Sequence, residues 1–193
     1  MENIQVYIGY AAGILGFIPF ILLIISMRKG ITKPNLAGWV LYTVAMVMIV
    51  ASSIALNAWQ AVWLAMAYVV GQSLVIAVSF KTGYFSFSRF DYWCLSISFL
   101  SLILWIYTNN PLYALVLNVI VDGLGTFAIS RKLYLHPGTE DTTAWVVGFL
   151  VALLNVFAVA SFDISNALYP IYIVLACALI AGLSLRRVNA INT

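Results

Sequence analysis

The amino-acid sequence predicts an all-α membrane protein with seven transmembrane helices, its N-terminus outside and its C-terminus in the cytoplasm. Three observations support this fold class: an apolar composition, seven apolar runs, and basic residues confined to alternate loops. Of the 193 residues, 64% are hydrophobic and 8% are charged, whereas a soluble domain carries about 25% charged residues. A chain of this size cannot bury so much apolar surface in a soluble core. We therefore expect lipid to be its main solvent.

Each apolar run is near the length that crosses the hydrocarbon core of a bilayer. The runs extend approximately over Val6–Met27, Leu36–Leu56, Trp59–Phe80, Tyr92–Tyr107, Pro111–Ser130, Thr143–Phe162 and Ser165–Leu185. A single helix through the second and third runs would span about two membrane thicknesses, so a tight turn is expected near Asn57. No Lys or Arg precedes the first run, so we expect it to remain as a helix and not to be a cleaved signal peptide.

The basic residues give the predicted orientation, because loops rich in Lys and Arg stay in the cytoplasm. All nine of them follow the first, third, fifth and seventh runs: Arg28, Lys29 and Lys33, then Lys81 and Arg89, then Arg131 and Lys132, then Arg186 and Arg187. The opposite side carries Glu2 and Asp163 but no basic residue. Seven helices make this division consistent, and we expect the chain in a bacterial inner membrane.

The two halves of the chain share a pattern of residues that indicates an internal repeat. In the first half Arg28-Lys29 is followed by Pro34 and Trp39, and in the second half Arg131-Lys132 is followed by Pro137 and Trp145. The predicted architecture is two parallel three-helix bundles, residues 1–83 and 109–193, joined by a connector helix in residues 84–108.

The segment DGLGTFAISRKLYLHPGTEDTTAWVV carries a closer likeness to a known family. Its Asp, Gly, basic helix end, Pro, acidic residue and Trp resemble the second-repeat signature of the PQ-loop superfamily, which includes the SWEET transporters. The matching positions are Asp122, Gly125, Arg131, Lys132, Pro137, Glu140 and Trp145. The family's Pro-Gln pairs are absent: Ala128 stands where the second proline is expected, and Pro19 is followed by Phe20. The resemblance therefore implies the 3+1+3 fold and a transport function, in a divergent member without the usual proline hinges.

Asp122 is the strongest candidate for a functional residue. It lies nine residues before Arg131, which places it about 13 Å into the membrane. An ionisable group at that depth costs about 2.5 to 3.5 kcal/mol or more unless it faces a cavity, has a polar partner or takes up a proton. We expect Asp122 to border a polar cavity or to contact Asn155, Gln72 or a tyrosine hydroxyl. A structural role, locking two helices together, is the alternative.

Further candidates for solute binding lie at a similar depth. Asn118 shares a helix face with Asp122, although interhelical hydrogen bonding would explain it equally well. Gln72 and Cys177 each lie nine residues before a basic helix end, and the SWEET resemblance implies that this level contacts substrate. Asn155 completes the predicted set, while simple packing is an equal or better explanation for Gln72 and Cys177.

Enzymatic function is not predicted. The single histidine, His136, lies in a predicted loop, and no GxxxxGK or HExxH motif occurs. Cys94 and Cys177 have no metal-ligand spacing, the basic residues form no nucleic-acid-binding patch, and no cofactor is expected. The sequence favours a transporter or facilitator for a small polar solute such as a sugar, an amino acid or a vitamin, with proton coupling as an option. A non-transporting membrane receptor or assembly protein of the same fold is the alternative. The expected partners are the lipid bilayer and the solute, and a homo-oligomer remains open.

Overall fold

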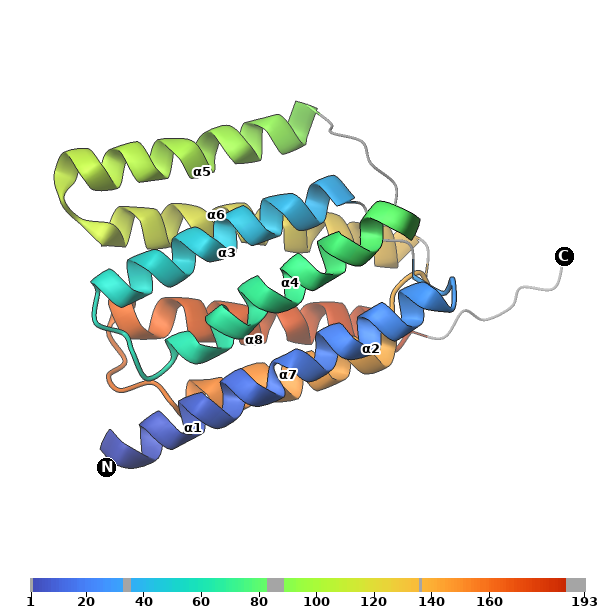
Figure 1. Cartoon of the computed structure of the whole chain (residues 1–193), viewed down its shortest axis with the longest axis horizontal. Coiled ribbons are helices and arrows are strands. Elements are labelled where there is room, and N and C mark those ends of the chain that lie inside the picture. The colour runs from blue at the N-terminus through green and yellow to red at the C-terminus, as the bar shows by residue number, and fades with distance from the viewer. Residues whose placement is uncertain (1, 33–35, 83–88, 136, 187–193) are drawn as a thin grey trace, which may run out of the picture.

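A computed structural model describes residues 2–32, 36–82, 89–135 and 137–186 of the chain, and these residues form an all-helical bundle (Figure 1). Its helices are α1 (Glu2–Leu15), α2 (Phe17–Arg28), α3 (Leu36–Ala55), α4 (Val62–Thr82), α5 (Arg89–Thr108), α6 (Pro111–Leu135), α7 (Thr142–Val156) and α8 (Ile164–Ser184). The predicted repeat pattern includes Pro34, the predicted basic loops include Lys33 and Arg187, and the loop expected after Lys132 includes His136. These residues lie outside the described part of the chain.

Within the described ranges, five segments are long and apolar enough to cross a membrane, which indicates a helical membrane protein. They are Ile4–Arg28, Gly38–Ala55, Val62–Phe80, Pro111–Leu135 and Ile164–Ser184. Two further apolar helices, Tyr92–Thr108 and Thr142–Val156, are shorter. Large apolar side chains face outward over the bundle, including Phe99, Ile106 and Leu175, as expected of a surface that contacts lipid tails.

The first predicted helix is interrupted once, at Gly16, between α1 and α2. Pro19 follows three residues later and has no N–H to donate to the carbonyl of Leu15, so one hydrogen bond of the helix is lost there. The two pieces continue in the same direction (Figure 1). The first run therefore contains a break, although no Pro-Gln pair is present.

The sixth predicted run ends earlier than expected. It was expected to extend to Phe162, but α7 ends at Val156. The N–H groups of Phe157, Ala158 and Val159 then bond to carbonyls three residues back, which tightens the chain into a turn. This turn leaves a short loop before α8.

The carboxylate of Asp163 begins α8 by accepting hydrogen bonds from the backbone N–H groups of Ser165 and Asn166, as an N-cap residue does. The hydroxyl of Ser161 and the side chain of Asn166 also donate to it. These hydrogen bonds, that of Ser161 first, lower the pKa of Asp163 to about 2. Asp163 therefore stays charged at neutral pH.

α1 and α2 run in one direction, and from α2 onward successive helices alternate in direction, so that the C-terminal ends of α2, α4, α6 and α8 lie at the same end of the bundle (Figure 1). Arg28, Arg131, Lys132 and Arg186 lie at this end, which we call the basic end. The N-terminus lies at the opposite end.

The packing order is the same in both halves of the chain. α4 packs against α1 and α2 on one side and against α3 on the other, while α8 packs in the same way between α6 and α7. The two sets meet where α3 packs on α6 and where α1 and α2 pack on α7. α5 packs only on the outside of this arrangement, against α6 and α3.

Small residues on α1 allow α4 to approach closely. A Cβ on Gly9 would collide with the backbone carbonyl oxygen of Gln60, and one on Gly13 would lie 3.0 Å from the Cβ of Trp63. The Trp63 ring then packs edge-on against Tyr10, with centroids 4.7 Å apart. Such contacts favour helix association in lipid through van der Waals packing.

Gly9→Ala should therefore lower the thermal stability of the detergent-solubilised protein, because backbone cannot move aside cheaply. We expect a loss of about 1–3 kcal/mol, typical of overpacking. Gly182→Ala is the matched control, since no atom lies within 4 Å of its added Cβ. Equal melting temperatures for the two variants would contradict this packing.

Candidate functional site

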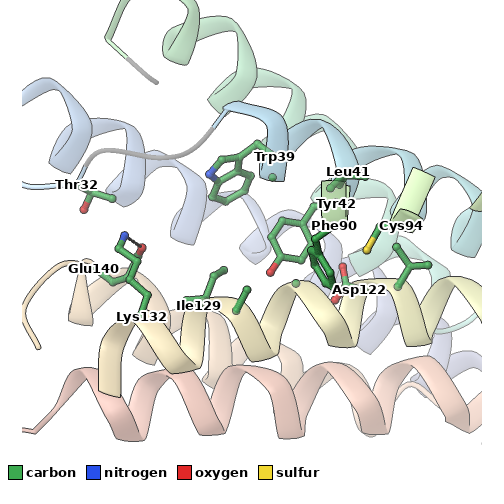
Figure 2. A pocket seen from close by; sticks show the side chains of 14 residues that line it. Thr32, Trp39, Leu41, Tyr42, Phe90, Cys94, Asp122, Ile129, Lys132 and Glu140 are labelled. Atoms are coloured by element: carbon green, nitrogen blue, oxygen red, sulfur yellow. Dashed lines mark hydrogen bonds and ion pairs between the residues drawn. The ribbon is translucent and has the colours of Figure 1, made fainter. Parts of the chain in front are cut away.

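A cavity of about 240 Å³ lies between α3, α5 and α6 and extends from the basic end toward the middle of the bundle. Thr32, Lys132 and Glu140 lie at its outer part, and Tyr42, Cys94 and Asp122 lie further inside (Figure 2). We call it the outer chamber.

A second cavity of about 80 Å³ lies between the two sets of helices. We call it the inner chamber. It is lined from α2, α3, α4, α6, α7 and α8. Trp39, Tyr42, Asp122 and Ile129 line both chambers. These four residues therefore form the boundary between a space near the basic end and a space at the centre of the bundle.

Asp122 is 4% exposed, and its carboxylate accepts a hydrogen bond from the hydroxyl of Tyr172 on α8. Thr126, one turn further along α6, lies 3.0 Å from the same hydroxyl. Since the Tyr172 proton is directed at Asp122, Thr126 acts as the donor to Tyr172. The predicted contact of Asp122 with a tyrosine hydroxyl is confirmed. Asp122 also borders both chambers, but their lining is mostly apolar and not polar as expected. The tyrosine is one that the sequence alone did not identify.

Gly125 brings a second tyrosine to the carboxylate. A Cβ at Gly125 would lie 2.6 Å from the ring and the hydroxyl of Tyr42, so only glycine lets this ring rest on α6. Tyr42 comes from α3, and its ring lies beside Asp122 in the cavity wall (Figure 2). Sequence reasoning missed Tyr42. The signal that could have found it is the glycine one turn from the buried acid, which marks a close approach.

Gln72 and Cys177 both line the inner chamber, from α4 and α8. Their equal distance from the basic helix ends had predicted a common level, and the structure places them at one cavity. Gln72 is 5% exposed, and its Oε1 has no hydrogen-bond partner among the described residues. A buried amide oxygen without a protein partner is costly, so it needs water or a solute in the chamber.

Asn118 and Asn155 lie elsewhere and do not line either chamber. The side-chain amide of Asn118 donates to the hydroxyl of Ser101 on α5, at 2.6 Å. That of Asn155 donates to the carbonyl of Ala61, just before α4, at 3.2 Å. Each asparagine thus joins two elements, which is the structural role that the sequence had left open for Asn118.

Four aromatic rings form one wall of the chambers, in the order Tyr42, Trp39, Phe20 and Tyr68. Their centroids are 6.1 Å, 6.4 Å and 5.1 Å apart in succession. All three contacts are edge-to-face, the arrangement that aromatic quadrupoles favour. A Cβ on Gly71 would collide with the Phe20 ring, so glycine again admits a ring.

An ion pair stands at the outer part of the cavity. The ammonium of Lys132 lies 2.9 Å from Oε1 of Glu140, and the indole N–H of Trp145 donates to the other carboxylate oxygen at 3.5 Å. The two charges neutralise each other. In the described part of the chain, no group of three His, Cys, Asp or Glu residues could hold a metal ion.

The opposite end of the helix interface is closed by direct packing. Ala61, Ala158, Val159 and Ala167 form a buried cluster with Ile8 against it. The amide of Gln5 on α1 donates to the carbonyl of Val159 at 2.9 Å. The chambers therefore extend toward the basic end, while small side chains and hydrogen bonds fill the other end.

The two places where the helix sets meet are alike in position but not in chemistry. Pro19 lies nine residues before Arg28, as Asp122 does before Arg131. Tyr42 lies three residues after Trp39, as Gly148 does after Trp145. At one junction Tyr42 lies beside Asp122. At the other junction, a Cβ on Gly148 would lie 3.7 Å from the Pro19 ring. Gly148 and Pro19 are small and apolar, whereas Tyr42 and Asp122 at the corresponding positions are polar.

The hydrogen bond between Asn118 and Ser101 should be measurable as an energetic coupling. In a double-mutant cycle of Asn118→Ala and Ser101→Ala, we expect about 0.6 kcal/mol and at most about 1.7 kcal/mol, as for other membrane hydrogen bonds. The measurement is the free energy of unfolding in mixed micelles. Ser96→Ala is the control, because Ser96 on α5 is exposed and bonds only to the Tyr92 carbonyl, so it should add to Asn118→Ala without coupling.

No model of a protein family, no curated protein and no solved structure is significantly similar to this chain.

Proposed function

We propose that this protein is a membrane transporter or facilitator for a small polar solute, which binds between the two sets of helices. The observation that carries the proposal is Asp122, a carboxyl group in the middle of an apolar helix that lines both chambers. An ionisable residue inside a membrane is expensive and marks a solute or ion pathway by default.

The shape of the cavity favours transport over a purely structural role. It extends from the basic end to the centre and meets packed side chains beyond it. Alternating access requires a central site that reaches one side while the other is closed. The break between α1 and α2 lies at the level of the inner chamber, since Pro19 lines it, and gives that helix a place to bend.

The packing order supports two parallel repeats of three helices. In this proposal the first bundle spans residues 1–83, the connector 84–108 and the second bundle 109–193. The third helix of each bundle lies between the other two, and α5 lies outside them as a connector would. Corresponding helices of the two bundles run in the same direction (Figure 1). The likeness to the PQ-loop superfamily rests on this order and on the signature around Asp122.

The basic end is the cytoplasmic end in this proposal, because Lys and Arg are retained there during insertion. The N-terminus is then outside, the C-terminus is inside, and the chambers are reached from the cytoplasm. The same topology in a bacterial inner membrane would expose the site to a proton gradient.

Proton coupling through Asp122 follows from its surroundings. The titratable groups that face it are Tyr42 from α3, Cys94 from α5, Tyr169, Tyr172 and Cys177 from α8, and Tyr68 across the inner chamber. None of these is a base that could hold a positive charge beside it. An ionised Asp122 therefore has no positive partner among these groups. Its charge is compensated when the carboxylate binds a proton or pairs with a charged solute.

The orientation can be tested by cysteine labelling, with Cys94 and Cys177 first replaced by alanine. Cysteines at Thr108 and Ala160, which are exposed at the end opposite the basic end, should react with an impermeant thiol reagent on intact cells. Cysteines at Ile31 and Thr139 should react only after the membrane is opened. The reverse pattern would overturn the orientation, and a mixed pattern would overturn the number of crossings.

The role of Asp122 can be tested in proteoliposomes, by measuring pH change inside the vesicles as candidate solutes are added outside. Wild-type flux should depend on pH. Asp122→Asn keeps the shape but removes the titration, so any remaining flux should be independent of pH. Asp163→Asn, which removes a charge far from the chambers and keeps the cap, should behave as wild type.

Unchanged pH dependence in Asp122→Asn would contradict proton coupling through this residue. A solute that binds the purified protein but never crosses the vesicle membrane would favour a receptor over a transporter. If Asp122→Asn is neutral and Asp122→Leu fails to fold, the carboxyl group has only a structural role.

A further inference from the structure

The charges around the chambers select among classes of solute. Of the described residues that line them, only Asp122, Lys132 and Glu140 carry charged groups. Lys132 and Glu140 form an ion pair at 2.9 Å, so their charges offset each other. Ionised Asp122 leaves one uncompensated negative charge, which is costly in an apolar interior unless a positive charge comes to it.

Aromatic rings surround the same point. Tyr42 and Trp39 line both chambers, and Phe20 and Tyr68 extend the wall into the inner one. A cation near a ring face is attracted by the ring quadrupole, most strongly by that of Trp, and aromatic enclosures are the usual sites for quaternary ammonium groups. In Figure 2 the Tyr42 ring lies between Trp39 and Asp122.

We propose that the chambers bind an organic monocation, an amine or quaternary ammonium compound without a carboxylate, with its cationic group between Asp122 and the aromatic wall. This assignment rests on the proposed transport function and names its substrate class. An amino acid fits poorly because its carboxylate would meet no unpaired basic side chain among the described lining residues. A sugar would leave the charge of Asp122 uncompensated.

The cation and a proton compete for one carboxyl group. When the cation enters, the O–H bond of neutral Asp122 breaks, the proton leaves to water, and the carboxylate pairs with the cation. The charge in the site is the same before and after, so neither state leaves an unpaired charge in the membrane. The result is a one-for-one exchange of cation for proton.

Choline and its uncharged carbon isostere, 3,3-dimethylbutan-1-ol, provide a matched pair of probes, because they differ in charge and hardly in shape. We expect choline to raise the melting temperature of the purified protein in detergent, and the isostere to leave it unchanged. A ligand stabilises the state that binds it. Choline affinity should fall as the pH is lowered, since protons then occupy the carboxyl group.

Asp122→Asn should weaken choline binding by about thirtyfold or more, as loss of one partner in a buried charge pair does, and should abolish its pH dependence. Asp163→Asn is the matched control and should bind as wild type. Trp39→Leu and Trp39→Phe give a second test that leaves the carboxyl intact. The leucine variant should lose about twofold to thirtyfold in affinity, and the phenylalanine variant should lose less. The melting temperature of each variant without ligand shows whether it is folded.

Equal stabilisation by choline and the isostere would overturn the proposal, as would stabilisation by glucose or lysine with none by choline. Flux of glucose in proteoliposomes without choline binding would overturn the substrate class and leave the transport function standing. Choline binding without choline flux would overturn the transport function and leave the substrate class standing. If choline neither binds to the protein nor crosses the vesicle membrane, the cation assignment is wrong.

Discussion

Lipid offers no hydrogen bonds, so every polar side chain within this bundle needs a protein partner or a cavity that admits water or solute. Two arrangements of such groups occur among the described residues, and neither pairs every polar atom, because the amide oxygens of Asn118, Asn155 and Gln72 all lack a hydrogen-bond partner there. Asn118 and Asn155 donate across to neighbouring elements, at Ser101 and at the Ala61 carbonyl, and so fix helix positions. Asp122 and Gln72 instead face the chambers. The two asparagines therefore have a structural role, while Asp122 and Gln72 are the polar groups on which the proposed function rests.

The close approach of the helices depends on glycine at a few points. At Gly9 the neighbour is the backbone of Gln60 just before α4, at Gly13 it is Trp63 in the first turn of α4, and the result is tight packing. At Gly125 and Gly71 the neighbour is an aromatic ring, and the result is part of the chamber wall. Glycine thus allows close helix packing where the neighbour comes from the α4 region, and it allows an aromatic ring to line a chamber where the neighbour is a side chain.

Much of the fold could be predicted from the sequence, because spans and loops depend on local composition. The apolar runs correspond to the helices, with the first run divided between α1 and α2. The spacing of Gln72 and Cys177 from the basic helix ends predicted a common level, and both residues line the inner chamber. The depth of Asp122 predicted its cavity and a tyrosine partner, but not which tyrosine. Helical periodicity shows which residues share a face but not which helix that face meets. For this reason Asn118 and Asn155 were expected at the site, and Tyr42 was missed.

The unlike junctions of the proposed repeats have a consequence for stoichiometry. Two identical three-helix chains related by symmetry would carry the same residues at both junctions, either two carboxyl groups or none. Joining the bundles in one chain frees the two copies to diverge, and here one keeps Asp122 while the other has Pro19. If the proposed repeats are correct, a single chain therefore carries one carboxyl group at its two junctions, whereas a homodimer of one bundle would carry two or none.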